Sequence, residues 1–167
     1  MSMIGNLRRA TDAEVARLLA NPEEIGTFLY GEPDGYEDRA DVDLDKAWHG
    51  IHFVLTGSKW GGEPPLNFLV SGGTEIGDED VGYGPARAFT SAEVRRIHEA
   101  LTAIPPEEFQ RRINLGALAE AGFYPDVWDR ADERDSNIEY LASNYATLRS
   151  YVETLARDAL GMLVYIN

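Results

Sequence analysis

The hydrophobic positions of this chain follow helical spacing over much of its length and strand-like spacing near its two ends. The clearest helical pattern lies in residues 43–57, where four apolar side chains recur at spacings of four, three and four: Leu44, Trp48, Ile51 and Leu55. Asp43 can cap the amino end of this predicted helix, and Gly57 suits the left-handed residue that follows a helix end. Gly50 in its interior costs about 1 kcal/mol relative to Ala, which suggests that another backbone approaches it closely.

Two capping boxes predict further helix starts, because in each a Thr and the Glu three residues later can bond to each other's backbone amides. They are Thr11–Glu14 and Thr90–Glu93. A longer helix is predicted from about 135 to 159, where apolar residues alternate by threes and fours, with Gly161 as its cap. Residues 162–166 are apolar throughout, which is typical of a strand in the centre of a sheet.

Together these patterns predict one α+β domain over residues 1–167. We expect a single compact domain in which several helices pack on a small mixed or antiparallel sheet, with a long C-terminal helix followed by a terminal strand. A chain of 167 residues with 44% hydrophobic residues is long enough for a self-sufficient core. Residues 31–43 and the glycine-rich segment 72–85 are acidic and rich in turn formers, so both are predicted to be loops. Neither has the spacing of a nucleotide or calcium loop.

The net charge of the chain limits the classes of partner that we expect it to bind. Its formal net charge is −14 at pH 7, whereas nucleic acids and anionic membranes attract basic surfaces. We therefore expect no nucleic-acid partner and no membrane partner. An acidic surface can steer a basic protein partner, although solvation alone also explains such a surface. The oligomeric state stays open.

The chain contains no cysteine, which excludes disulfides and thiol catalysis and fits a cytoplasmic protein. Its first residues do not have the pattern of a secretory signal. No run of residues approaches the ~20 apolar positions that a membrane span requires. We therefore expect a cytoplasmic location.

The predicted helix over 43–56 also carries the best candidates for chemistry. At about 100° per residue, Asp45, His49 and His52 fall together at the edge of its apolar face. A carboxylate and two imidazoles at this spacing could act as a general acid–base group or bind one metal ion. Since there is no HExxH pattern, we assign no metal and no cofactor. In the alternative interpretation, the imidazoles bridge core and solvent and Asp45 pairs with His49.

Several segments, in order along nearly the whole chain, carry a family resemblance: MSMIG at 1–5, LDKAWHGIH at 44–52, LTG at 55–57, GG at 72–73, GYGPAR at 82–87, YPDVW at 124–128 and LVYI at 163–166. With these segments the chain resembles the YfbM-like family, bacterial proteins of unknown function. The resemblance implies a single α+β domain and transfers no catalytic residues. It also draws attention to four candidate binding residues in its motifs: Lys46, Trp48, Tyr83 and Arg87. They would share a cleft if helix 43–56 lay beneath the loop at 72–87.

Three functions remain open at this stage. We favour an acidic protein-binding or interaction module, of the type that neutralises a toxin. The second is a small-molecule enzyme in which His49 or His52 is the general base and Asp45 orients it. No serine lies in the GxSxG context of a hydrolase. The third is a structural or oligomer-forming domain built on the long final helix.

Overall fold

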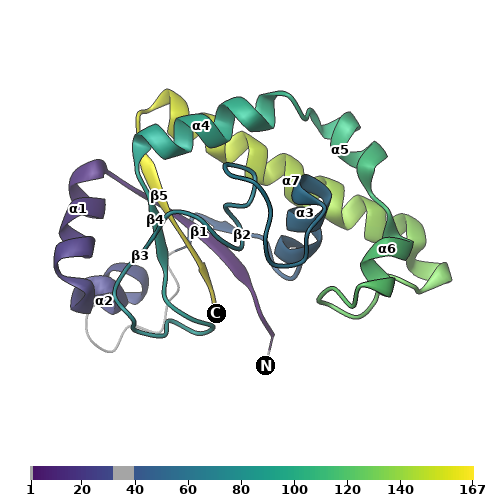
Figure 1. The fold of residues 1–167 in the computed structure, drawn as a ribbon, viewed down its shortest axis with the longest axis horizontal. Coiled ribbons are helices and arrows are strands. Elements are labelled where there is room, and N and C mark those ends of the chain that lie inside the picture. The colour runs from purple at the N-terminus through teal and green to yellow at the C-terminus, as the bar shows by residue number, and fades with distance from the viewer. Residues whose placement is uncertain (1, 32–39) are drawn as a thin grey trace.

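The computed structural model describes residues 2–31 and 40–167, which form an antiparallel sheet with helices on both faces (Figure 1). The strands of this sheet are β1 (Gly5–Ala10), β2 (Val42–Asp43), β3 (Thr74–Glu75), β4 (Arg87–Phe89) and β5 (Gly161–Ile166). Their spatial order is β2-β1-β5-β4-β3, and every neighbouring pair is antiparallel. The terminal strand is therefore the central one, as its uninterrupted apolar sequence predicts.

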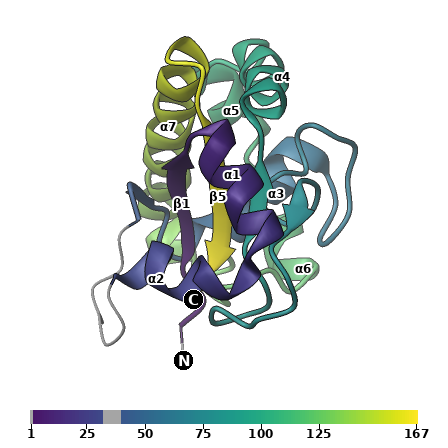
Figure 2. The same cartoon turned by 90° about the vertical axis from the view of Figure 1, so that its left-hand side faces the viewer.

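The helices divide unequally between the two faces of the sheet. They are α1 (Asp12–Ala20), α2 (Ile25–Tyr30), α3 (Ala47–Thr56), α4 (Ser91–Thr102), α5 (Pro106–Arg112), α6 (Leu115–Glu120) and α7 (Arg134–Arg157). In Figure 2, α1 and α2 lie in front of the sheet, whereas α3 to α7 lie on its other side. The α+β fold with a long C-terminal helix and a terminal strand is thus confirmed.

The central strand β5 separates two hydrophobic cores. Met162 and Val164 contribute to the larger core, together with α3, α4, α5, α6 and α7. Leu163 and Tyr165 contribute to the smaller core beneath α1 and α2. Because successive side chains of a strand point to opposite faces, a strand that is covered on both sides must be apolar at every position.

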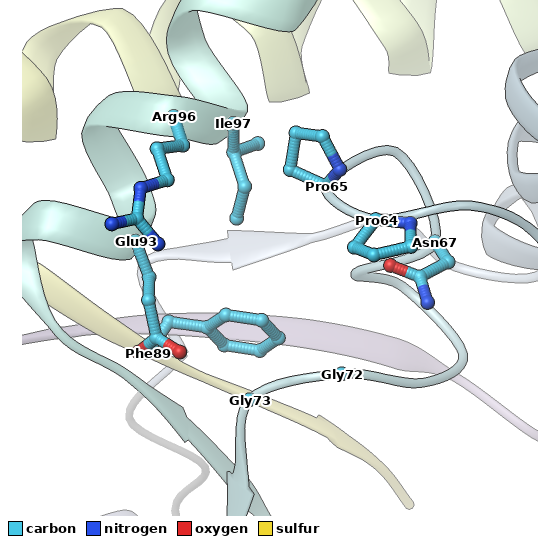
Figure 3. A pocket seen from close by; sticks show the side chains of 9 residues that line it. All are labelled: Pro64, Pro65, Asn67, Gly72, Gly73, Phe89, Glu93, Arg96 and Ile97. Carbon is cyan, nitrogen blue, oxygen red and sulfur yellow. The ribbon is translucent and has the colours of Figure 1, made fainter.

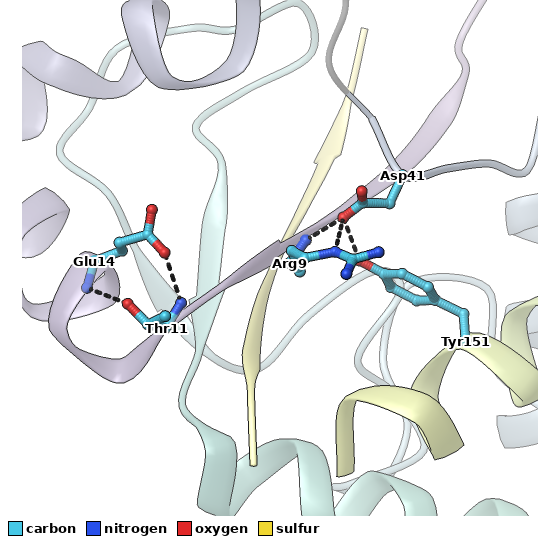
Figure 4. A network of polar contacts seen from close by, with 5 residues as sticks. All are labelled: Arg9, Thr11, Glu14, Asp41 and Tyr151. Carbon is cyan, nitrogen blue, oxygen red and sulfur yellow. Dashed lines mark hydrogen bonds and ion pairs between the residues drawn. The ribbon is translucent and has the colours of Figure 1, made fainter. Parts of the chain in front are cut away.

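Both capping boxes form as predicted. The Thr11 hydroxyl accepts the Glu14 amide at 3.1 Å, and the Thr11 amide donates to the Glu14 carboxylate at 2.9 Å (Figure 4). The same reciprocal pair joins Thr90 and Glu93 at the start of α4. These starts were predictable because a capping box depends on residues only three positions apart.

A carboxylate beside the sheet edge joins three distant elements (Figure 4). Asp41 Oδ2 accepts hydrogen bonds from the Arg9 amide at 2.7 Å and from the Tyr151 hydroxyl at 2.8 Å. Burial alone would raise the pKa of Asp41, but these donors hold it below its ordinary value. The contact ties β1 and the residue before β2 to α7, so the short edge strand is fixed from both sides.

The predicted helix over 43–56 begins later than its apolar pattern suggests. Val42 and Asp43 pair with β1 as strand β2, and the helix α3 starts only at Ala47. Between them Asp45 adopts a left-handed backbone with φ of 47°, and its amide donates to the Asp43 carboxylate at 2.6 Å. Asp43 therefore closes a turn instead of capping the helix. The predicted end is confirmed, since Gly57 is left-handed with φ of 70°.

Two glycines differ from their predicted roles. The long helix α7 ends at Arg157, and Gly161 belongs to β5 instead of capping α7. A Cβ at Gly161 would collide with the carbonyl oxygen of Phe89, so the glycine allows close approach of neighbouring strands. A Cβ at Gly50 would lie 2.8 Å from Leu141 Cδ2, so its close neighbour is a side chain of α7 and not a backbone.

Of the predicted loop at 31–43, residues 32–39 lie outside the described residues. In the part of the chain that the structure describes, no helix is both long enough and apolar enough to cross a lipid bilayer.

Candidate functional site

The two histidines of α3 lie in the protein interior. His49 is 1% exposed and His52 is 0% exposed, and both belong to a helix whose face packs against α7. A general acid or base must reach substrate directly or through one water. Their burial therefore does not favour catalysis, and the catalytic assignment stays a prediction.

Both ring nitrogens of His49 are occupied by backbone groups. Nε2 lies 3.0 Å from the Lys59 carbonyl oxygen, and the Tyr124 amide donates to Nδ1 at 3.3 Å. Since Nδ1 accepts, Nε2 carries the proton, and the ring is neutral. Burial lowers the pKa of His49 to about 4; the nearby Lys59 charge adds to this shift, while the Lys59 carbonyl opposes it.

The imidazole of His49 is also enclosed by aromatic rings. It stacks on Trp48 with centroids 4.7 Å apart and lies 4.6 Å from the ring of Phe123. On its outer side the Trp60 ring lies at 4.4 Å. Polar contacts and ring contacts together fix this side chain in one orientation, which is the geometry of a structural histidine.

His52 is less completely bonded than His49. Its Nε2 lies 3.4 Å from the Thr56 hydroxyl, a long contact, and its buried Nδ1 has no hydrogen-bond partner of ordinary geometry within the described ranges. Burial lowers the pKa of His52 to about 4; the electrostatic interactions with the neighbouring His49 and with Arg87 add to this shift, while the Gly61 backbone opposes it. His52 is therefore neutral at physiological pH.

Asp45 does not join the two histidines. It precedes α3 and is exposed, and its carboxylate accepts the Tyr140 hydroxyl of α7 at 2.8 Å. Burial raises the pKa of Tyr140, and the bond to Asp45 raises it further. The predicted pairing of Asp45 with His49 does not form, since both nitrogens of His49 bond to backbone groups. Among residues 2–31 and 40–167, no three His, Cys, Asp or Glu side chains group as metal ligands.

The four candidate binding residues differ in burial and in the contacts that they make. The Trp48 indole is buried and donates to the Met3 carbonyl at 3.0 Å, while the Lys46 amide donates to Tyr140. Tyr83 is exposed near the end of β5, where its amide donates to the Ile166 carbonyl at 3.0 Å. That these residues share a cleft stays a prediction.

Arg87 supports the loop that precedes β3. Its guanidinium donates to the carbonyl oxygens of Leu69 at 2.9 Å, Ser71 at 2.7 Å and Gly72 at 3.0 Å. Burial lowers the pKa of Arg87 to about 10, and the charge of Glu75 on the neighbouring strand opposes that shift. Every one of these acceptors belongs to the backbone, so Arg87 positions the segment 69–72.

The longer segment 64–73, which contains these acceptors, forms one wall of a cavity of about 230 Å³ (Figure 3). The opposite wall is α4, and the ring of Phe89 lies at the floor. The lining residues are Pro64, Pro65, Asn67, Gly72, Gly73, Phe89, Glu93, Arg96 and Ile97. Gly73 is left-handed with φ of 67°, and a Cβ there would lie 2.9 Å from the Phe89 ring. The cavity therefore depends on a backbone that passes closely over an aromatic ring.

Sequence reasoning missed this cavity and the exposed ring of Trp60. Glu93 is recognisable from sequence as a capping residue, and Gly72 and Gly73 are recognisable as turn residues. The adjacent Pro64-Pro65 pair and a tryptophan in a loop of small residues were the available signals. Neither signal says which helix the loop will meet, since that depends on contacts between residues far apart in sequence.

Comparison with known proteins confirms the family resemblance. A family model described as a domain of unknown function, DUF1877, matches residues 1–165. The chain is similar to the crystal structure of YfbM from Escherichia coli, described as a protein of unknown function. The TM-score is 0.74 at 22% identity, over 98% of this chain and 99% of that chain. No curated protein matches. At this identity the likeness establishes the fold alone.

Proposed function

The chain belongs to the DUF1877 family of unknown function, and from its own surface we propose that it is an acidic interaction module that binds a basic protein. The observation that carries the proposal is the side chain of Trp60, which is 57% exposed although it rests on a rigid support. A tryptophan in this position is a typical anchor of a protein interface.

The ring of Trp60 rests on a cluster formed by His49, Trp48 and Phe123. The rings of Trp60 and His49 lie 4.4 Å apart, and His49 is itself held between the Lys59 carbonyl and the Tyr124 amide. An aromatic side chain that is already held in place loses little conformational entropy when a partner covers it. In this proposal the buried histidine contributes to binding by positioning an exposed ring.

The segments around Trp60 supply negative charge. Glu63 is exposed on the same loop, and Glu120 and Asp126 are exposed on the segment that packs beside it. The ammonium group of Lys59, the residue before Trp60, donates to the Ala121 carbonyl at 2.9 Å. With a net charge of −14 on the whole chain, a basic partner would be attracted and oriented before contact.

We further propose that the protein is bacterial and that this encounter takes place in the cytoplasm; the absence of cysteine from the sequence supports the cytoplasmic location.

A retention experiment tests the proposal. The immobilised protein is incubated with an extract of its source cells at low salt, beside the variants Trp60→Ala and Leu19→Ala. Leu19 is the matched control, because it is also a large exposed apolar residue but lies on α1, across the sheet. We expect a basic protein that is retained by the parent and by Leu19→Ala, that is lost with Trp60→Ala, and that high salt releases. Equal retention by Trp60→Ala, or no retention at low salt, would contradict the proposal.

A further inference from the structure

The cavity beside α4 has an apolar body and a charged rim. Phe89 and Ile97, both buried, line it together with the rings of Pro64 and Pro65. Its volume of about 230 Å³ corresponds to roughly eight water molecules at about 30 Å³ each. Drug-sized ligands occupy cavities of about 300–1,000 Å³, so a ligand that fills this one is smaller.

One cation and one anion stand on the α4 wall, a turn apart. The Arg96 guanidinium is exposed and takes part in no hydrogen bond or ion pair within the described ranges. Glu93 Oε2 accepts the Thr90 amide at 2.7 Å and the Thr90 hydroxyl at 3.1 Å, whereas Oε1 accepts no bond from the described residues. Figure 3 shows the Glu93 carboxylate beside Phe89 and the Arg96 side chain above it on the same helix.

Across the cavity, the amide oxygen of Asn67 is a further acceptor without a donor among the described residues. The Asn67 nitrogen donates to the Ser71 hydroxyl at 3.1 Å, which fixes the orientation of the side-chain amide. A Cβ at Gly72 would meet this oxygen at 3.4 Å, so the glycine leaves it uncovered. Glu93 and Asn67 are thus each held by hydrogen bonds while part of their bonding capacity stays open.

We infer that this cavity is a binding site for a small zwitterion, namely a free α-amino acid with an apolar side chain. The carboxylate pairs with Arg96, the ammonium group with Glu93 Oε1, and the side chain crosses Phe89 toward Pro64 and Pro65. A simple anion would meet the Glu93 carboxylate, and a simple cation would meet the Arg96 guanidinium. A ligand that carries a carboxylate and an ammonium group on the same carbon atom offers a partner to each of the two groups.

A ligand series tests separately whether the carboxylate, the ammonium group and the apolar side chain of the ligand are each required. L-Phenylalanine, 3-phenylpropanoate, 2-phenylethylamine and glycine are titrated into the intact protein by calorimetry and by amide chemical shifts. These compounds present the full zwitterion, the acid alone, the amine alone and the zwitterion without an apolar side chain. We expect saturable binding of L-phenylalanine, with shifts at Gly72, Gly73 and Glu93, and at least about tenfold weaker binding of the other three. Equal binding of either singly charged compound, or no binding of L-phenylalanine, overturns the inference.

Matched variants of α4 test the two charged partners. Arg96→Gln is compared with Arg95→Gln, and Glu93→Gln with Glu99→Gln, since Arg95 and Glu99 are exposed on the same helix but do not line the cavity. A glutamine at position 93 keeps the capping box. We expect the cavity variants to weaken L-phenylalanine about tenfold and the control variants to leave it within about twofold. If control and cavity variants weaken binding equally, the effect is one of overall charge and the site is not the one proposed.

Circular dichroism and thermal unfolding of each variant show whether it remains folded. A cavity variant that is folded as the parent is and binds L-phenylalanine equally well also overturns the inference. Because Trp60 does not line this cavity, the result is independent of the interaction proposed for Trp60.

Discussion

The cluster around His49 and the cavity beside α4 both contain polar side chains, but these differ in whether the protein itself supplies their hydrogen-bond partners. In the first, an imidazole is covered by Trp48 and Phe123 and bonded at both nitrogens. In the second, the Arg96 guanidinium and one oxygen of Glu93 stand at an opening with no partner in the described part of the chain. His49, a residue with obvious chemistry, is bonded at both ring nitrogens, while the less conspicuous Arg96 and Glu93 keep bonding capacity that is open at the cavity.

This difference follows from the cost of leaving polar groups unpaired. A buried polar atom without a partner costs about 1–3 kcal/mol, so a folded core tends to bond its histidines internally. A charged group at a cavity mouth is paired with water and carries no such cost. The bonding state of a side chain is therefore a better guide to a binding site than the residue type. Four predictions test this contrast.

The largest effect is expected from acid. His49 and His52 each have a pKa of about 4 in the folded protein against an ordinary value of 6.5. Below pH 6.5 the unfolded chain binds protons that the folded chain does not, so the free energy of unfolding falls as the pH is lowered. The loss is up to about 1.4 kcal/mol per pH unit for each histidine, until the pH reaches the folded pKa. Urea unfolding between pH 8 and 4.5 measures the slope.

The variant His52→Leu is the control for this pH dependence. It removes one buried imidazole, so the slope between pH 6.5 and about 4.5 is expected to fall by roughly half. Above pH 7 the slope should be unchanged. An identical slope in the variant would mean that other groups cause the acid sensitivity.

The second-largest loss of stability is expected when the His49 ring is removed. His49→Ala removes a ring stacked between aromatic neighbours and leaves a buried carbonyl and amide without partners, at a cost of about 3 kcal/mol. Denaturant unfolding at pH 7.5 measures it, with His98→Ala as the control, since His98 is only half-buried on α4. Comparable losses in the two variants would show that His49 has no special structural role. Trp60 fluorescence is also expected to shift, because its support is gone.

The fold was predictable wherever short-range rules apply. The capping boxes of α1 and α4 each depend on residues three apart, and the central position of β5 follows from a run of apolar residues that a solvent-facing strand would not tolerate. The start of α3 was not predictable in the same way. Val42 and Asp43 become a strand only because β1 is beside them, and the left-handed backbone of Asp45 follows from that pairing.

The predicted grouping of Asp45 with His49 and His52 on one helix does not form, for a related physical reason. Periodicity placed Asp45 on a helix with His49 and His52, but the residue lies before the helix and bonds to Tyr140 of α7. The cavity arises where the segment 64–73 meets α4, and no local pattern encodes that meeting. Sequence therefore identified an informative helix, but the contacts that decide its role come from distant parts of the chain.

A smaller effect is expected at the glycine that shapes the cavity. Gly73→Ala places a Cβ 2.7 Å from the Ala88 carbonyl oxygen at a left-handed residue, which we expect to cost about 2 kcal/mol. Gly84→Ala is the matched control, because Gly84 is also left-handed but has no atom within 4 Å of the added Cβ. It should cost only about 1 kcal/mol. Thermal unfolding compares the two, and equal losses would show that backbone conformation alone, and not the close passage over Phe89, is what requires Gly73.

The smallest effect is expected from Arg96→Gln. Because its guanidinium has no protein partner within the described ranges, its removal should change the free energy of unfolding by less than about 0.5 kcal/mol. Arg87→Gln provides the contrast, since that guanidinium holds the carbonyl oxygens of Leu69, Ser71 and Gly72. Its loss removes three hydrogen bonds, two of them partly buried, at a cost of about 2 kcal/mol. Urea unfolding of both variants at pH 7.5 shows whether Arg96 stabilises the fold, as Arg87 does, or contributes little to its stability. A destabilisation by Arg96→Gln as large as that by Arg87→Gln would assign Arg96 to the scaffold, and the contrast between a bonded core and an open cavity would then no longer hold.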